Sequence, residues 1–177
     1  MFSFMDDATK TATEPRPPDA IFAPEDDVGA LLVQAYQGEV SGEVLFGIVA
    51  SGTDDPERRR KFEVLTRLEA KTREACLPAM RRHGLPTDPD PKTVADAKVL
   101  GEAVLGMTWE QLLSSFEPIT SQFLALYRRI GEISEADRAE SGLLVAHEQA
   151  LMDFARRELA GETETSLELI EALPHLA

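Results

Sequence analysis

A chain of 177 residues, of which 43% are hydrophobic, can form one globular domain with a sizeable core. The net charge of -14 argues against nucleic acid as a partner, because phosphate binding requires a basic surface, and it disfavours acidic lipid surfaces. No 18-residue apolar run occurs, and the first residues lack the basic region of a signal peptide. We therefore expect a cytoplasmic protein without a membrane segment.

The composition favours helix over sheet. Ala, Leu, Glu and Arg are abundant, whereas runs of Val, Ile or Thr are few. The only cysteine, Cys76, excludes an intramolecular disulfide and fits a small core residue better than a nucleophile, since no basic partner adjoins it. We predict an all-α protein with a bundle over residues 23–161.

Residues 1–22 mix Thr, Pro and charged residues, a composition that predicts a disordered tail. Pro24 and the three acids after it then favour a helix entrance, and we expect the first helix over about 25–51.

The first helix carries two acids within an apolar stripe, which reads Leu32, Tyr36, Glu39, Glu43 and Phe46. A buried carboxylate requires a partner, a proton or a cation, so this stripe is either half-exposed or part of a site. We expect Glu39 to face inward, whereas Glu43 could face either way.

Three glycines interrupt the same helix, and each costs about 1 kcal/mol relative to alanine. Gly38, Gly42 and Gly47 therefore predict either close approach of a neighbouring helix or room for a ligand beside Glu39 and Glu43.

A second helix is predicted from Pro56 to about residue 83, with Asp55 as its N-cap and Gly84 after its end. The short turn before it forces the first two helices to pack antiparallel. Because Glu39 and Glu69 are equally distant from this turn, they should lie at the same height.

A proline-rich crossing segment, residues 85–92, and a short helix, residues 93–106, form the predicted long crossover. Thr108 and Gln111 then form a capping box that opens a helix to about residue 132. Pro118 predicts a kink in it, with Glu117 at the kink.

The last long helix is predicted over 134–160 and ends at Gly161. Glu117 and Glu148 are equally distant from the turn that precedes this helix, so they too should share a height. His83 and His175 lie near segment ends and are expected to be solvated.

The C-terminal extension, residues 162–177, contains a short amphipathic helix over 166–173. We expect it to dock on the bundle or on a second subunit, which makes a homodimer the expected assembly.

Two helical hairpins with mid-height acids, joined by a long crossover, place Glu39, Glu69, Glu117 and Glu148 around one level. With the glycine-glutamate motif of residues 35–43, the chain resembles the ferritin-like superfamily, rubrerythrin-type proteins in particular, over about residues 25–160. The resemblance implies a four-helix bundle with a di-iron or di-manganese centre held by Glu and Glu-x-x-His motifs.

Both histidines of those motifs are replaced, because Thr72 follows Glu69 and Leu151 follows Glu148 at the third position. His147 could substitute, although His147 and Glu148 are adjacent on the helix and are not expected both to face the axis squarely. The metal candidates are thus Glu39, Glu69, Glu117, Glu148 and His147, with Glu43 and Thr72 as neighbours.

We interpret the sequence as a binding or interaction module with a degenerate carboxylate site that has lost its di-iron centre and needs no cofactor. The alternative is a divergent carboxylate oxidoreductase that holds iron or manganese and acts on oxygen or peroxide.

Overall fold

The computed structural model describes residues 27–176, and all regular structure within that range is helical. The tail predicted for residues 1–22 lies outside the described residues. Four long helices form the bundle: α1 (Val28–Gly52), α2 (Pro56–Arg82), α5 (Phe116–Ile133) and α6 (Arg138–Ala160). The shorter elements are α3 (Pro91–Val104), α4 (Trp109–Ser114), the 3-10 turn η1 (Glu135–Asp137) and α7 (Glu168–Glu171).

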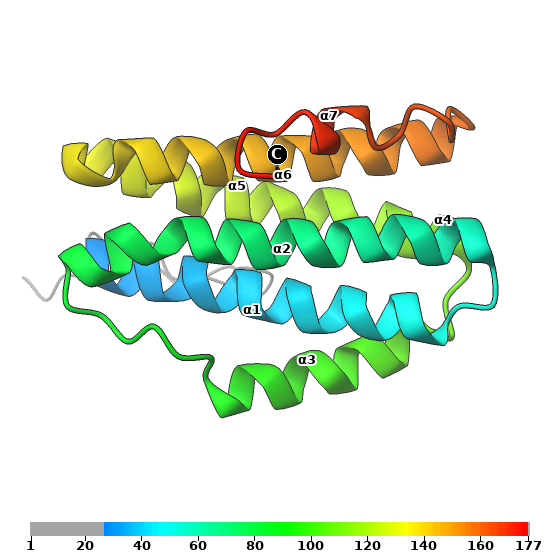
Figure 1. The fold of residues 1–177 in the computed structure, drawn as a ribbon, viewed down its shortest axis with the longest axis horizontal. Helices are drawn as coiled ribbons and strands as arrows, with labels where there is room; N and C mark the ends of the chain where they lie inside the picture. The colour runs from blue at the N-terminus through cyan, green and yellow to red at the C-terminus, as the bar shows by residue number, and fades with distance from the viewer. Residues whose placement is uncertain (1–26, 177) are drawn as a thin grey trace, which may run out of the picture.

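The long helices form two antiparallel hairpins, α1 with α2 and α5 with α6 (Figure 1). Across the bundle, α1 lies against α5 and α2 against α6. The crossover runs from the end of α2 along the outer side of α1, where α3 packs, before the chain enters α4 (Figure 1). The predicted all-α bundle of two hairpins joined by a long crossover is present.

The turn chemistry predicted from sequence defines most helix ends. The Asp55 side chain accepts the backbone N–H groups of residues 57 and 58, with Pro56 as the first residue of α2. Thr108 and Gln111 form the reciprocal capping box that opens α4. Gly84 and Gly161 adopt φ values of 63° and 82° after α2 and α6, a left-handed conformation that glycine adopts without steric cost.

The effect of Pro118 is a break rather than a kink inside one helix. Ser114 ends α4 and Phe116 starts α5, so the interruption lies one turn before the proline. Pro118 has no N–H for the carbonyl of Ser114 and its ring crowds that carbonyl, which is why the helix ends there.

The crossover is fixed to α1 by polar contacts. The Tyr36 hydroxyl donates to the Thr87 carbonyl oxygen at 2.5 Å, and the Gln37 amide bonds the backbone of residues 88 and 90. These bonds hold the proline-rich segment against the bundle.

The apolar core consists of two clusters. One is built around Phe62, Phe116 and Phe154 and the other around Tyr36, Met80 and Ile130. Full burial of one large apolar side chain contributes about 1.5–3 kcal/mol, so both clusters stabilise the bundle substantially. On α2, α5 and α6, buried polar residues lie between the residues of the two clusters, and Glu39 on α1 joins them in a polar layer.

The C-terminal extension docks on its own bundle. Leu167, Ile170 and Leu173 are buried in the same cluster as Phe154, and α7 packs on α6. The apolar face that suggested a second subunit is therefore covered within the chain, and the homodimer stays a prediction. No helix in the range 27–176 is long and apolar enough to cross a membrane.

His83 is not simply solvated, contrary to expectation. Its Nε2 lies 2.7 Å from Oδ2 of the buried Asp137, which also accepts from Arg82. Burial raises the pKa of Asp137, but bonds from Ser134, His83 and Arg82 outweigh it and lower the pKa overall. This network joins the end of α2 to the start of α6.

Candidate functional site

Four ionisable side chains from three helices meet in the polar layer. Glu39 comes from α1, Glu69 from α2, and both His147 and Glu148 from α6. Their exposed fractions are 1%, 4%, 1% and 4%. Charged groups are almost never buried to this extent without partners or a cation, so the cluster is the strongest candidate for a functional site in the described chain.

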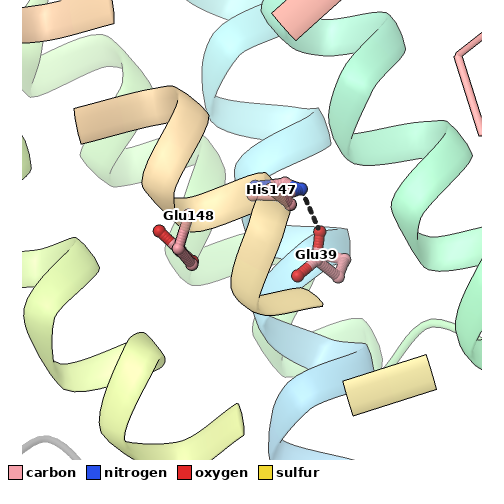
Figure 2. A group of neighbouring side chains, drawn as sticks. All are labelled: Glu39, His147 and Glu148. Atoms are coloured by element: carbon pink, nitrogen blue, oxygen red, sulfur yellow. Dashed lines mark ion pairs between the residues drawn. The ribbon is translucent and has the colours of Figure 1, made fainter. Parts of the chain in front are cut away.

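The imidazole of His147 lies between the carboxylates of the first hairpin. Its Nδ1 is 3.5 Å from Glu39 Oε2, and its Nε2 is 3.3 Å from Glu69 Oε1. One ligand atom each from Glu39, His147 and Glu148 can be chosen so that all lie within 4.8 Å of one another. Figure 2 shows His147 directed at Glu39, with Glu148 leaving the same turn of α6 in another direction.

Both His147 and Glu148 are buried, although we did not expect both to face the axis squarely. The reason is that α6 has neighbours on several sides, since it contacts α2, α4, α5 and α7. A wide buried face accommodates two adjacent residues 100° apart on the helix.

Thr72 fixes the tautomer of His147. The Thr72 hydroxyl donates to the Leu68 carbonyl at 2.9 Å, and its oxygen lies 2.7 Å from His147 Nδ1. When the hydroxyl proton lies on the Leu68 carbonyl, the Thr72 oxygen accepts from His147 Nδ1, and in that tautomer the lone pair of Nε2 faces Glu69. The lone pair of His147 Nε2 and the carboxylate oxygen Glu69 Oε1 require a proton or a cation between them.

The carboxylate of Glu39 is only half satisfied. Tyr127 donates its hydroxyl to Glu39 Oε1 at 2.6 Å, whereas Glu39 Oε2 accepts no hydrogen bond. Glu148 Oε2 is likewise buried without a hydrogen-bond partner. Two buried oxygens from different helices thus lack hydrogen-bond donors, a deficit that either a proton or a bound cation would remove.

Burial dominates the protonation of the cluster. Desolvation raises the pKa of Glu39 to about 8. The charge interaction with His147 lowers this pKa, and the charge interaction with Glu69 raises it further. Desolvation also raises the pKa of Glu69 to about 8, and that of Glu148 well above its usual range. Burial lowers the pKa of His147. Without a cation, burial therefore favours the protonated form of these carboxyls and the neutral form of the imidazole.

The structure does not bring Glu117 into this cluster. Glu117 is exposed, and Thr120 takes the inward position on α5, with an exposed fraction of 4%. The inward stripe of α5 runs through Phe116, Thr120 and Tyr127, and Glu117 lies 100° from Phe116 on the helix. Because Glu117 is exposed, the predicted inward direction of its side chain is wrong.

Glu43 also stays outside the cluster. It is half-buried and forms an ion pair with Arg73 at 2.9 Å. Thr72, in contrast, is a direct neighbour of His147, as predicted for a residue beside the site.

Two further residues belong to the site. Tyr127 on α5 is not among the predicted metal candidates, and its hydroxyl donates to Glu39. His175 is half-buried rather than solvated, and its Nε2 lies 3.0 Å from Thr72 Oγ1. No local pattern could reveal the latter contact, because 103 residues separate the two side chains.

Gly38 and Gly42 admit side chains from neighbouring helices. A Cβ at Gly42 would collide with the carboxylate of Glu69, and one at Gly38 with the ring of Phe123. These contacts support the close-approach explanation, and at Gly42 the approaching group is itself a site residue. At Gly47 the nearest atom, a Thr66 methyl, would be 3.7 Å away, which is an ordinary contact.

A cavity of about 440 Å³ reaches the cluster from the side of α1 and α5. Glu39, Glu69 and Glu148 form part of its wall, together with apolar side chains such as Phe46 and Phe116. The buried acids can therefore be approached by a small molecule.

The donor set fits one divalent ion better than two. Three carboxylates and one imidazole supply oxygen and nitrogen ligands suited to manganese or iron(II). A di-metal centre of the ferritin-like type would need a second histidine, and Thr72 and Leu151 occupy the positions where the motifs require one.

No family model matches the chain, and comparisons with curated proteins and with solved structures gave no match. Any function assigned to the cluster therefore depends on its own geometry.

Proposed function

We propose that this chain is a ferritin-like helical bundle that binds one divalent metal ion, manganese or iron(II), through Glu39, Glu69, His147 and Glu148. Two antiparallel hairpins joined by a crossover support the architecture. The observation that carries the metal proposal is the pair of buried, unpartnered oxygens of Glu39 and Glu148 beside His147.

The electrostatics favour a cation. Three ionised carboxylates in one buried layer repel one another, and a divalent ion would reduce their summed charge from about −3 to about −1. The neighbouring residues suit such a site as well. Thr72 holds His147 in the tautomer that presents Nε2, and Tyr127 orients Glu39, in the way that outer groups commonly orient metal ligands.

A bound iron or manganese ion would supply redox chemistry toward oxygen or peroxide. The chain's own contribution would be to hold the ligands, exclude bulk water from the layer, and keep Tyr127 in contact with Glu39. This is the oxidoreductase reading of the site, with one ion in place of two.

The test is metal content and affinity. Full-length protein, stripped with a chelator, is titrated with Mn²⁺ and, without oxygen, with Fe²⁺, and bound metal is measured by calorimetry and elemental analysis. We expect about one equivalent for the wild type, at least tenfold weaker binding for Glu39→Gln and Glu148→Gln, and unchanged binding for Glu117→Gln. Wild-type protein that binds neither ion would overturn the proposal.

A second candidate function is a metal-free binding module, and one observation favours it. Tyr127 already donates to Glu39, and Glu39 and Glu69 lie close enough to share a proton. With pKa values of about 8, both acids can be neutral at pH 7. This candidate predicts that a chelator leaves stability unchanged and that no metal copurifies.

A further inference from the structure

The cavity beside the acids is apolar over nearly all of its wall. Apolar residues of α1, α4, α5 and α6 line it, among them Phe46, Leu112, Phe116, Phe123 and Leu151. At about 440 Å³ its volume lies within the range of small-molecule sites, roughly 300–1,000 Å³. A cavity of this size and composition suits an organic molecule better than a water-filled path for ions.

Apart from Ser41 and Ser115, the polar side chains of the wall belong to the acid cluster and its neighbours. Glu39, Glu69 and Glu148 share this part of the wall with Thr120 and Tyr127. Among the described residues that line the cavity there is no Lys, Arg or His. An anionic ligand would therefore meet carboxylates without any cationic side chain, even with one divalent ion in place.

Exposed apolar side chains also contribute to the cavity wall. Leu100 on α3, Met107 before α4 and Ile119 on α5 are 46%, 45% and 42% exposed, and all three line the cavity. Large exposed apolar groups at the rim of a cavity are typical of a site for an apolar ligand.

We propose that the cavity binds an uncharged, apolar small molecule, aromatic or alkyl, with one part of it against Glu39 and Glu148. Gly38 is part of the same wall, and its lack of a side chain lets the ring of Phe123 lie against α1. That this molecule is the substrate of the metal centre rests on the proposed function, whereas its binding in the cavity does not.

The experiment uses N-phenyl-1-naphthylamine, an uncharged probe whose fluorescence rises in apolar surroundings. It is titrated into full-length protein, both metal-free and loaded with Mn²⁺. We expect saturable binding of about one probe per chain, displaced by neutral aromatic compounds or long-chain alcohols. The sulfonated relative 8-anilino-1-naphthalenesulfonate should bind at least tenfold more weakly.

Two variants locate the bound probe. Ser41→Trp places a large ring in the cavity wall, and Ile119→Trp does so at the exposed rim, where folding is less affected. Each should weaken probe binding at least tenfold. The control is Ser121→Trp, at an exposed position of α5 that does not line the cavity. Circular dichroism confirms that each variant is folded.

The outcomes separate the two proposals. Probe binding to protein that binds no metal would sustain the cavity and refute the metal centre. Metal binding without saturable probe binding would refute the cavity alone. Probe binding that is unaffected in both Ser41→Trp and Ile119→Trp, or equally tight binding of the sulfonated probe, would also overturn the inference.

Discussion

Metal-free protein should lose stability steadily as the pH rises from about 4.5 to about 8. The pKa values of Glu39 and Glu69 are raised by burial from 4.5 to about 8, so the folded chain holds protons that the unfolded chain has released. The stability that these groups contribute is fully present below pH 4.5 and is lost as the pH approaches 8.

The magnitude follows from the linkage of proton binding to folding. Each such carboxyl changes the free energy of unfolding by on the order of 1 kcal/mol per pH unit inside this window. For a chain of this size, 1 kcal/mol corresponds to roughly 2–4 °C in Tm. Glu39 and Glu69 are close neighbours, so they titrate as a pair. The change of the free energy of unfolding with pH therefore belongs to the pair and not to either residue alone.

Glu39→Gln isolates one contribution, because the amide keeps an oxygen for the Tyr127 hydroxyl but cannot ionise. We expect a flatter dependence of stability on pH for this variant, with its largest gain over the wild type near pH 8. The control, Glu63→Gln, removes an equal charge from an exposed position on α2 and should run parallel to the wild type.

The assay is urea denaturation followed by circular dichroism between pH 5 and pH 9, with a chelator present. Repeating it with Mn²⁺ tests the metal proposal, since an ion that displaces protons should stabilise the wild type more at pH 8 than at pH 5.5. If the free energy of unfolding changes with pH equally in metal-free wild type and Glu39→Gln, burial of Glu39 does not raise its pKa as argued.

Three more predictions concern single contacts. Lys61→Met should lower the free energy of unfolding by about 3–5 kcal/mol in urea denaturation, because the ammonium lies 2.5 Å from the buried carboxylate of Glu158. The double variant Lys61→Met with Glu158→Leu should recover most of that loss. Gly42→Ala should displace the Glu69 carboxylate and so weaken Mn²⁺ binding at least tenfold in calorimetry. The control Gly47→Ala should keep the Mn²⁺ affinity and raise the free energy of unfolding by up to about 1 kcal/mol, because alanine favours a helix over glycine. Thr72→Val removes the acceptor of His147 Nδ1 and should weaken Mn²⁺ binding about 10–100-fold, and an unchanged affinity would show that the hydroxyl does not orient the imidazole.

Much of the fold could be read from local chemistry. Several helix ends are set by interactions within a few residues, so they do not depend on the rest of the chain. Examples are Asp55 with Pro56, the capping box at Thr108, and the glycines at positions 84 and 161. Equal chain lengths from the first turn likewise determined the shared height of Glu39 and Glu69, because helical rise per residue is constant.

The directions of side chains depended on packing. Glu117 is exposed, whereas Thr120 takes the inward position on α5, which starts after the helix is interrupted at Ser115. His147 and Glu148 are both inward because α6 is surrounded on several sides, which a helical wheel drawn for one helix does not include.

The sequence by itself determined the all-α class, most helix ends and the shared level of Glu39 and Glu69, since these follow from periodicity, capping and rise per residue. Only the tertiary structure decided which acids meet, that Tyr127 donates to Glu39, and that His175 reaches Thr72 across the chain. The physical reason is that these contacts join residues 88 and 103 positions apart, where the partner is chosen by the packing of whole helices and not by neighbours in sequence.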